Sequence, residues 1–320
     1  MTSPLLTQQM KQKLARLGMV NFLVGKKLLA NLRNKWKLLE LYQRAEVIRF
    51  LADSQLSPPK QERVFVAIAH IVSPQDVSDP EKRAPKLERL KNCIDALLNS
   101  FAHCQLEISI TTLPGRNVVS YLPAYQRKLV HIQESPDWEP MYVGYRAQDE
   151  MIDRLPEFDW FLMIEDDIVI YDSLFLEKLK RFNRKSGSLQ YVLFPNRYEM
   201  YEGKKSYIDL TVELDLAWDR VSMITDDGVK FAECSNPHTG LYCLSREQLA
   251  YWAASGRHWK NQSLVVGPLE SAATFALLEC FKLYKPHPQN LNYFEVRHYD
   301  TKYSKLFPDA PHHIISAVHQ

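Results

Sequence analysis

Glycine is scarce in this chain, and its scarcity excludes one large group of nucleotide enzymes. Only 10 of the 320 residues are glycine, and none lies in residues 68–74, where the first predicted strand ends. A phosphate-binding loop of the P-loop type needs several glycines after such a strand, so that backbone amides can approach the phosphates. No pattern of this kind occurs anywhere in the chain. A P-loop enzyme is therefore excluded.

Cysteine pairs, net charge and long apolar runs are also limited. The five cysteines form no CxxC pair and no zinc-type spacing, so we expect reduced core thiols in a cytosolic protein. A formal net charge of +2 is too small to indicate a nucleic-acid partner. The longest uncharged stretch near the N-terminus, residues 17–25, is far shorter than the roughly 20 residues that cross a bilayer, and no cleavage site follows it. We expect a cytoplasmic protein without a signal peptide.

The chain is long enough for one main domain with an N-terminal helical extension. Residues 1–58 form the predicted extension and residues 59–320 the main domain. Within the extension, residues 5–52 have apolar residues at helical spacing and a strong excess of Lys and Arg over acidic residues. Such a basic amphipathic segment has two possible roles. It contacts the anionic inner face of a membrane, or it packs on the main domain with its basic face in the solvent.

The segment after the extension alternates strand-like and helix-like patterns. Residues 64–72 and 106–112 are rich in apolar and β-branched residues and are expected to be strands, and residues 86–101 carry leucines at helical spacing. The polar stretch 73–85 holds three prolines and is expected to be a loop. This βαβ order predicts an α/β fold with a mostly parallel central sheet flanked by helices.

The later elements are less regular. A helix is expected over residues 143–155, a second opens at Ser173 as its N-cap, and a third begins with Pro268 and runs to residue 283. Residues 196–235 are expected to be irregular with one or two alternating strands, at residues 207–214 and 229–234, and a long excursion of this kind is usually functional in a compact domain. The tail from residue 285 is expected to be loop-rich.

The most distinctive stretch is residues 158–170, an apolar run interrupted by Glu165, Asp166 and Asp167. The run predicts a buried strand that carries three carboxylates at its end. Strand alternation would place the first and third acids on one side and the second on the other. Buried carboxylates require a compensating cation, and oxygen ligands at the end of a strand suit Mg²⁺ or Mn²⁺. A solvated turn is the alternative.

The order of these features resembles that of the metal-dependent glycosyltransferases of the GT-A fold. The βαβ start, the acidic triplet, a glutamate at a later helix start and a histidine near the C-terminus carry the resemblance, which covers roughly residues 64–303. Residues 164–168 are particularly similar to the DxD-type motif of eukaryotic N-acetylglucosaminyltransferases. The resemblance implies a Rossmann-like sheet, a Mn²⁺ or Mg²⁺ ion, a nucleotide-sugar donor such as a UDP-sugar, and a glycan or other hydroxyl acceptor.

The resemblance also implies roles for individual residues. Asp167 would be the last acid of the motif and the direct metal ligand, and His298 would complete the metal site. Glu165 and Asp166 would hold the ribose or the sugar of the donor. His287 is a second histidine available for the metal, since imidazole suits Mn²⁺.

Glu270 matches the general base of the inverting members of this family. A position in the first helical turn favours the anion that a base requires, although acidic residues are also common there for stability alone. The family's usual acid pair is missing, because Leu269 precedes Glu270 and Ser271 follows it. Inversion is expected from the resemblance, and this departure leaves the stereochemistry open.

Two further residues are candidates for the nucleotide. His70 lies just past the middle of the first expected strand, where members of the family contact the base, and a core histidine is the alternative. Arg146 could face the nucleotide or form an ion pair with Glu150, four residues later in the same helix. The residues expected beside the acceptor sugar are His238, Thr239 and Gly240.

The predicted reaction is the transfer of a sugar from a nucleotide-sugar to a hydroxyl group. The metal would bridge the diphosphate, and Glu270 would activate the acceptor. Two alternatives stay open: another metal-dependent nucleotide enzyme, and a non-catalytic adaptor that uses residues 5–52 to bind a membrane surface or a partner. Metal-dependent binding of a nucleotide-sugar would separate the transferase from the adaptor.

Overall fold

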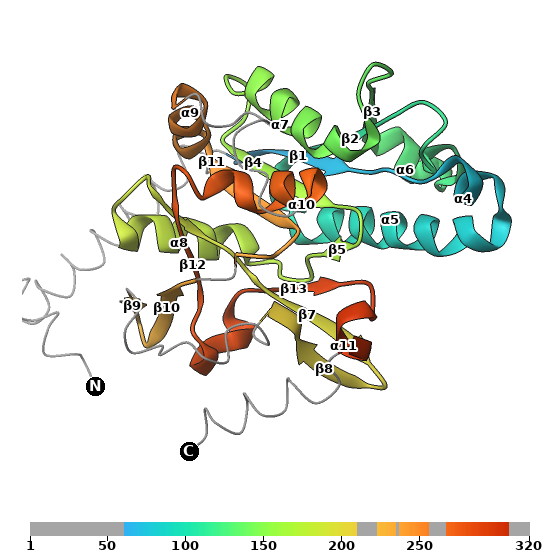
Figure 1. Ribbon diagram of the computed structural model, residues 1–320. Helices are drawn as coiled ribbons and strands as arrows, with labels where there is room; N and C mark the ends of the chain where they lie inside the picture. The colour runs from blue at the N-terminus through green and yellow to red at the C-terminus, as the bar shows by residue number, and fades with distance from the viewer. Residues whose placement is uncertain (1–60, 210–222, 235–236, 256–266, 307–320) are drawn as a thin grey trace, which may run out of the picture. The chain divides into compact units, whose positions relative to one another are not determined.

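A computed structural model describes residues 61–209, 223–234, 237–255 and 267–306 (Figure 1). The predicted extension 1–58, with its candidate membrane segment 5–52, lies outside these residues. No helix in the described ranges is both long and apolar enough to span a bilayer.

A five-stranded sheet forms the centre of the domain, in the order β11-β4-β1-β2-β3. Strands β4, β1, β2 and β3 are mutually parallel, and β11 is antiparallel to β4. The predicted mostly parallel α/β sheet is confirmed. The strands are β1 (Arg63–Ala69), β2 (Gln105–Thr112), β3 (Val130–Glu134), β4 (Trp160–Glu165) and β11 (Leu241–Ser245).

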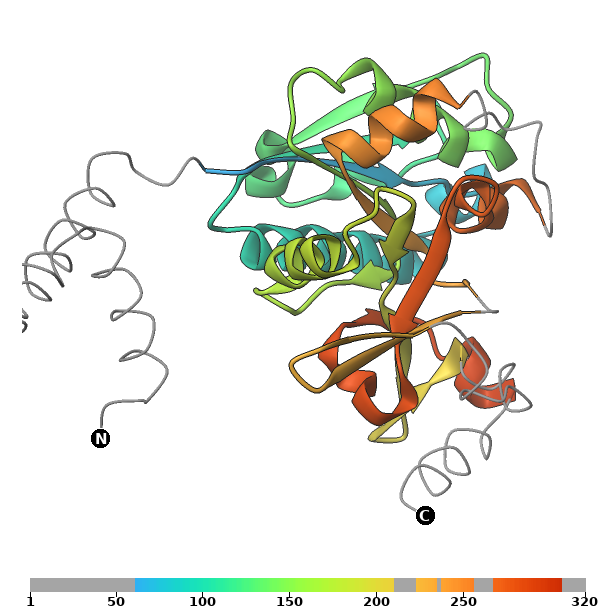
Figure 2. The same cartoon turned by 90° about the vertical axis from the view of Figure 1, so that its left-hand side faces the viewer.

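Helices cover both faces of this sheet (Figures 1 and 2). The alternation of β1 accounts for the two layers, because Val64 and Val66 pack in one apolar cluster while Phe65 and Ala67 pack in the other. The first layer contains α5 (Pro80–Ser100), α6 (Ala124–Leu129) and α8 (Phe175–Ser186), and the second contains α7 (Val143–Asp153), α9 (Arg246–Ala254) and α10 (Pro268–Ala273).

The core contains the expected thiols. All five cysteines are free, and four of them are buried. Burial raises the pKa of Cys243 well above its usual range, so its thiol stays protonated. The prediction of core thiols is thus confirmed.

Three predictions were wrong about where helices begin or end. The stretch 73–85 is not a loop, because Pro74 begins α4 (Pro74–Ser78) and Pro80 begins α5, both at helix starts where proline is tolerated. Ser173 is not an N-cap; α8 begins later, and the Asp172 carboxylate accepts the Leu174 N–H instead. The third helix, α10, ends at Ala273 rather than near residue 283.

The chain after α10 turns into a short 3₁₀ helix, η5 (Phe275–Leu277), and then into strand β12 (Lys282–Pro286). This strand pairs with β6 (Tyr191–Leu193) and β10 (Val229–Glu233), and β9 (Met223–Asp226) completes a four-stranded sheet. Pairing with these distant strands therefore overrides the helical pattern of the residues in β12.

A second small sheet follows the order β5-β13-β7-β8. The expected strand at residues 229–234 is confirmed as β10, but the irregular structure expected over residues 196–206 was wrong, and so was the loop-rich tail, since this sheet takes strands from both regions. Its strands are β5 (Ile168–Val169), β7 (Asn196–Tyr201), β8 (Lys204–Tyr207) and β13 (Glu295–His298), and the described tail also contains η6 (Pro288–Tyr293) and α11 (Lys302–Leu306).

Candidate functional site

The acidic triplet lies where the chain leaves the carboxyl end of β4. The strand ends at Glu165, and Asp166 and Asp167 lie in the turn before β5. Strand alternation therefore does not extend over Asp166 and Asp167, and the expectation that Glu165 and Asp167 share one side stays a prediction. Two backbone hydrogen bonds fix the ends of the triplet: Glu165 N–H donates to the carbonyl of Gly240 at 2.9 Å, and Tyr299 N–H donates to that of Asp167 at 2.7 Å.

Asp166 contacts His70, which follows β1 and is fully buried. The Val118 N–H donates to Nε2 of His70 at 3.2 Å, so this nitrogen carries no proton. Nδ1 must therefore carry the proton, which it donates to the Asp166 carboxylate. The structure places this neutral histidine beside the acidic motif, as a support for one of its members.

Asp167 contacts His298, the last residue of β13. Nε2 of His298 lies 3.4 Å from Oδ2 of Asp167, and Nδ1 lies 2.8 Å from Oε1 of Glu199. Burial alone would lower the pKa of His298, but its hydrogen bonds with the two carboxylates outweigh burial and raise this pKa to about 9. The imidazolium in turn lowers the pKa of Asp167 against the opposite effect of burial. The three side chains form a charged chain of contacts.

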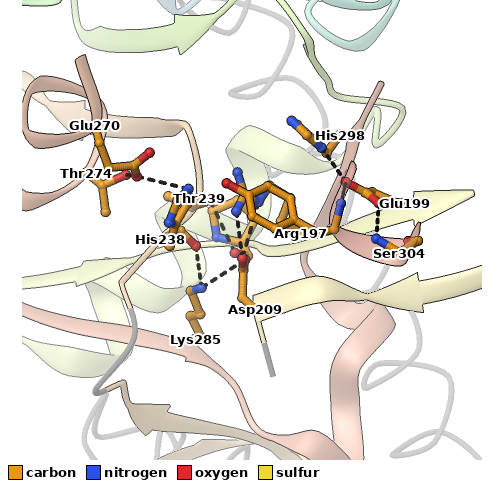
Figure 3. Close-up of polar contacts among 12 residues, drawn as sticks. Arg197, Glu199, Asp209, His238, Thr239, Glu270, Thr274, Lys285, His298 and Ser304 are labelled. Carbon is orange, nitrogen blue, oxygen red and sulfur yellow. Dashed lines mark hydrogen bonds and ion pairs between the residues drawn. The ribbon is translucent and has the colours of Figure 1, made fainter. Parts of the chain in front are cut away.

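Glu270 lies in the first turn of α10, where the sequence places it at a helix start. Its Oε1 is 3.0 Å from Nε2 of His238 and accepts a hydrogen bond from the Thr274 hydroxyl at 3.2 Å (Figure 3). Burial, then Asp167, then Glu270 raise the pKa of Glu165 well above its usual range. Carboxylates from β4, the following turn and α10 therefore share one electrostatic environment.

A buried basic group counters this negative charge. Arg197, on β7, donates to Asp209 at 2.9 Å, and Lys285, on β12, lies 3.3 Å from the same carboxylate. Lys285 also donates to the carbonyl of His238 at 2.7 Å. Figure 3 shows this group between the Glu270 side and the His298 side of the cluster. Arg197 opposes the effect of the acids by favouring the ionised form of Glu165.

Gly240 lies directly against the motif. Its φ of +67° is in the left-handed region, and an added Cβ would be 2.8 Å from Oε2 of Glu165 and 3.0 Å from Cγ1 of Ile168. Glycine is thus required both by the backbone and by the space that the carboxylate occupies.

Most of the predicted site residues lie together, although they come from distant parts of the chain. The acidic motif lies at the end of β4 and in the turn after it. His70 follows β1, and His298 is the last residue of β13. His238 contacts Glu270. The eight that the described contacts and electrostatic effects connect are His70, Glu165, Asp166, Asp167, His238, Gly240, Glu270 and His298.

Three predicted residues have other surroundings. Arg146 donates to the Ser135 hydroxyl at 3.3 Å, and the alternative pair with Glu150 is not formed, because Glu150 accepts hydrogen bonds from Ser109 and Thr111. The buried Thr239 hydroxyl donates to the Pro195 carbonyl at 3.4 Å. His287 caps η6 through the Gln289 N–H. None of these contacts joins the acidic cluster.

Several residues that contact the predicted site residues were not predicted from the sequence. Arg197 and Glu199 stand two residues apart, a strand spacing that would have placed both on one face, but their region was interpreted as irregular. Tyr303, from α11, packs its ring 5.3 Å from the Arg197 guanidinium and 5.8 Å from the His298 ring. The missed residues are Arg197, Glu199, Asp209, Thr274, Lys285 and Tyr303.

The residues present fit a divalent cation. Oδ1 of Asp167 is buried and has no hydrogen-bond partner among the described residues, and Nε2 of His298 lies beside the same carboxylate. Glu199 holds the other nitrogen of that ring, as carboxylates do behind metal-binding histidines. The described residues hold no ready cluster of three or more such ligands. A Mg²⁺ type of site with one or two protein ligands and substrate phosphates fits this donor set.

Comparison with known proteins gives little further information. No family model and no curated protein matches the chain. A protein of Desulfovibrio desulfuricans, provisionally assigned as a nucleotide-diphospho-sugar transferase, is 8% identical, with a TM-score of 0.30; the match covers 59% of this chain and 65% of that one, less than two thirds. A mannose-1-phosphate geranyltransferase of Thermus thermophilus is also 8% identical, with 70% and 73% covered and a TM-score of 0.38. Likeness at this level does not assign an activity.

Proposed function

We propose that this chain is a glycosyltransferase that moves a sugar from a nucleotide-sugar to a hydroxyl acceptor. One observation carries the proposal: contacts bring three acids together at the carboxyl end of β4, where open α/β sheets bind ligands. Asp167 lies 3.4 Å from His298, and Glu165 is bonded through its N–H to Gly240, two residues after the His238 that contacts Glu270. Two of these acids pair with a histidine, Asp167 with His298 and Glu270 with His238, and a merely solvated turn would not need such partners.

The donor side would be formed by the acidic motif. Asp166, oriented by His70, and Glu165, packed against Gly240, would accept hydrogen bonds from the ribose or the sugar of the donor. Asp167 and His298 would hold a Mn²⁺ or Mg²⁺ ion, and His298 would release its Nε2 proton to solvent when the ion binds. The ion would offset the charge of the departing diphosphate of a UDP-sugar or a similar donor.

The acceptor side would be formed by Glu270 and its neighbours. Glu270 would take the proton of the acceptor hydroxyl as it attacks the anomeric carbon, and the bond from that carbon to the diphosphate would break. His238, 3.0 Å away, would orient the carboxylate. Attack on the face opposite the leaving group favours inversion, and the anomer formed would test this point.

The test measures binding and hydrolysis of UDP-, GDP- and CMP-sugars with and without Mn²⁺, because transfer to water requires no known acceptor. We expect metal-dependent binding of one donor by the wild-type protein, and loss of this binding in Asp167→Asn. Glu270→Gln should retain donor binding but lower turnover by about 10²–10⁴-fold, the usual contribution of a general base.

The matched control is Glu177→Gln, the same carboxylate-to-amide change on α8, where the side chain is half-exposed and pairs with Lys180. It should behave as the wild type in both measurements. If no donor binds while all variants stay folded, the transferase proposal fails. If Glu270→Gln turns over as fast as Glu177→Gln, the assignment of the base fails alone.

A further inference from the structure

The sheet β5-β13-β7-β8 presents a second polar face on the side away from the acidic cluster. Arg297 pairs with Val169 and with Tyr198, so these three residues point to one face. His298 pairs with Ile168 and contacts Glu199 on the other face, which belongs to the site described above. Neighbouring residues of one strand thus serve opposite sides of the sheet.

A pocket of about 240 Å³ lies on the Arg297 face. Tyr171, Tyr198 and Arg297 line it, together with two carboxylates and Lys178. Tyr171 is 58% exposed, so its ring is accessible from the solvent. A volume of this size is below that of pockets for drug-sized ligands and suits a single ring.

The two carboxylates of this pocket are already engaged. Asp172 lies 2.6 Å from Nζ of Lys178, which also donates to a backbone carbonyl. Glu295 accepts hydrogen bonds from Lys205 at 2.5 Å and from the Tyr207 hydroxyl at 2.6 Å. Asp172 is therefore paired with Lys178 and Glu295 with Lys205 and Tyr207, which leaves both acids little capacity for a cationic ligand.

Arg297 is the charged group of the pocket that is not engaged. Its Nε is buried and has no hydrogen-bond partner, and its guanidinium takes part in no ion pair, in the part of the chain that the structure describes. Its one close aromatic contact is the ring of Tyr299, 4.6 Å away. A guanidinium in this condition favours a carboxylate or phosphate, which it binds with two parallel hydrogen bonds.

We propose that this pocket binds an acidic saccharide, a sugar ring that carries a carboxylate. The carboxylate would pair with Arg297, and the apolar C–H face of the ring would lie on Tyr171. The sugar hydroxyls would meet the polar rim around Lys178. An exposed tyrosine beside an unpaired guanidinium favours an acidic sugar over a bare phosphate, because a phosphate has no face to stack. The site is separate from the transfer reaction and does not rest on it.

The test measures binding by the full-length protein of methyl glucuronide, methyl glucoside and inorganic phosphate, with ligand-observed NMR titrations. We expect the glucuronide to bind at least about tenfold more tightly than the other two, since one charge-assisted bidentate contact contributes this much. Arg297→Gln and Tyr171→Ala should each weaken glucuronide binding by about tenfold. A saturating UDP-sugar with Mn²⁺ should not displace the glucuronide.

The matched control is Arg83→Gln, because Arg83 also stacks on a tyrosine, at 4.0 Å from the ring of Tyr121, and neither residue lines the pocket. It should bind glucuronide as the wild type does. Equal binding of glucuronide and glucoside, equal binding of phosphate, or displacement by the UDP-sugar would each overturn the proposal. Tyr171→Ala, an exposed change, keeps the test decisive if Arg297→Gln fails to fold.

Discussion

The three consecutive acids of the motif are chemically similar but have different partners. Asp166 accepts a hydrogen bond from a neutral histidine, while Asp167 pairs with an imidazolium. Glu165 faces two other acids, which together with burial raise its pKa. Donor side chains on two of the acids and mutual repulsion at the third thus give the three acids different environments, which the triplet alone could not reveal.

Gly240→Ala tests how closely the chain is packed around Glu165. The substitution forces an L-residue to a φ of +67° and brings a Cβ within 2.8 Å of the carboxylate. We expect a loss of free energy of unfolding of about 1–2 kcal/mol from the backbone, and about 1–3 kcal/mol more from the overpacking. Urea unfolding measures the sum, and donor titration measures the displacement of the carboxylate.

Gly115→Ala provides the control at the same scale. Gly115 has the same φ of +67°, but its added Cβ would meet nothing within 4 Å. The Gly115→Ala variant should lose only the backbone part of the free energy of unfolding and should bind the donor as the wild type does. Equal losses in the two variants would show that the close approach to Glu165 has no energetic consequence.

At the scale of the element, the start of α9 contains a complete capping box. The Ser245 hydroxyl accepts the Gln248 N–H at 3.3 Å, and Oε1 of Gln248 accepts the Ser245 N–H at 3.1 Å. Ser245→Ala should therefore lower the free energy of unfolding by about 1 kcal/mol. The midpoint of urea unfolding, at an unchanged slope, measures this loss.

Ser173→Ala is the corresponding control. Ser173 is also a serine just before a helix, but its side chain makes no capping hydrogen bond at the start of α8. We expect the change in the free energy of unfolding to stay within about 0.5 kcal/mol. A loss as large as that of Ser245→Ala would mean that the two serines act alike.

Elements with a strong pattern could be predicted from the sequence, and weakly patterned ones could not. The buried runs of β1 and β4 gave correct predictions because burial decides them. Of the two small sheets, only β10 was predicted as a strand in the region after residue 196, and the hairpin that joins it to β9 was missed. Asp227-Gly228 has positive φ at both residues, the turn that Asp-Gly favours between short strands. That signal was available in the sequence.

At the scale of the whole molecule, the candidate site depends on contacts between distant segments. Glu270 and the motif could be selected from their chemistry, since acids at a strand end and at a helix start are visible in the sequence. Arg197 and Lys285 could not be selected in this way, because they join the site only through ion pairs with Asp209, which lies 12 and 76 residues away in the sequence. The burial of these opposite charges arises only when the strands assemble, so the sequence of a single strand cannot predict it.

Asp209→Asn tests the energetic contribution of that buried group. Burial opposes ionisation of Asp209, but Arg197 and Lys285 outweigh it and lower its pKa below the ordinary value of about 3.9. The carboxylate therefore stabilises the fold at neutral pH, and the amide would leave two buried cations uncompensated. We expect a loss of about 3–5 kcal/mol in the free energy of unfolding at pH 7.

The pH dependence gives the sign of this effect. A lowered folded-state pKa means that the stabilisation is complete above the unfolded-state pKa and is lost as pH falls through the folded-state pKa. Urea unfolding of both proteins at stepwise lower pH should thus show the gap between wild type and Asp209→Asn narrowing below about pH 4. Asp226→Asn, which breaks a surface pair with Arg181, should show a much smaller gap at pH 7. A gap for Asp209→Asn that stays constant into acid would mean that packing, and not charge, holds these strands together.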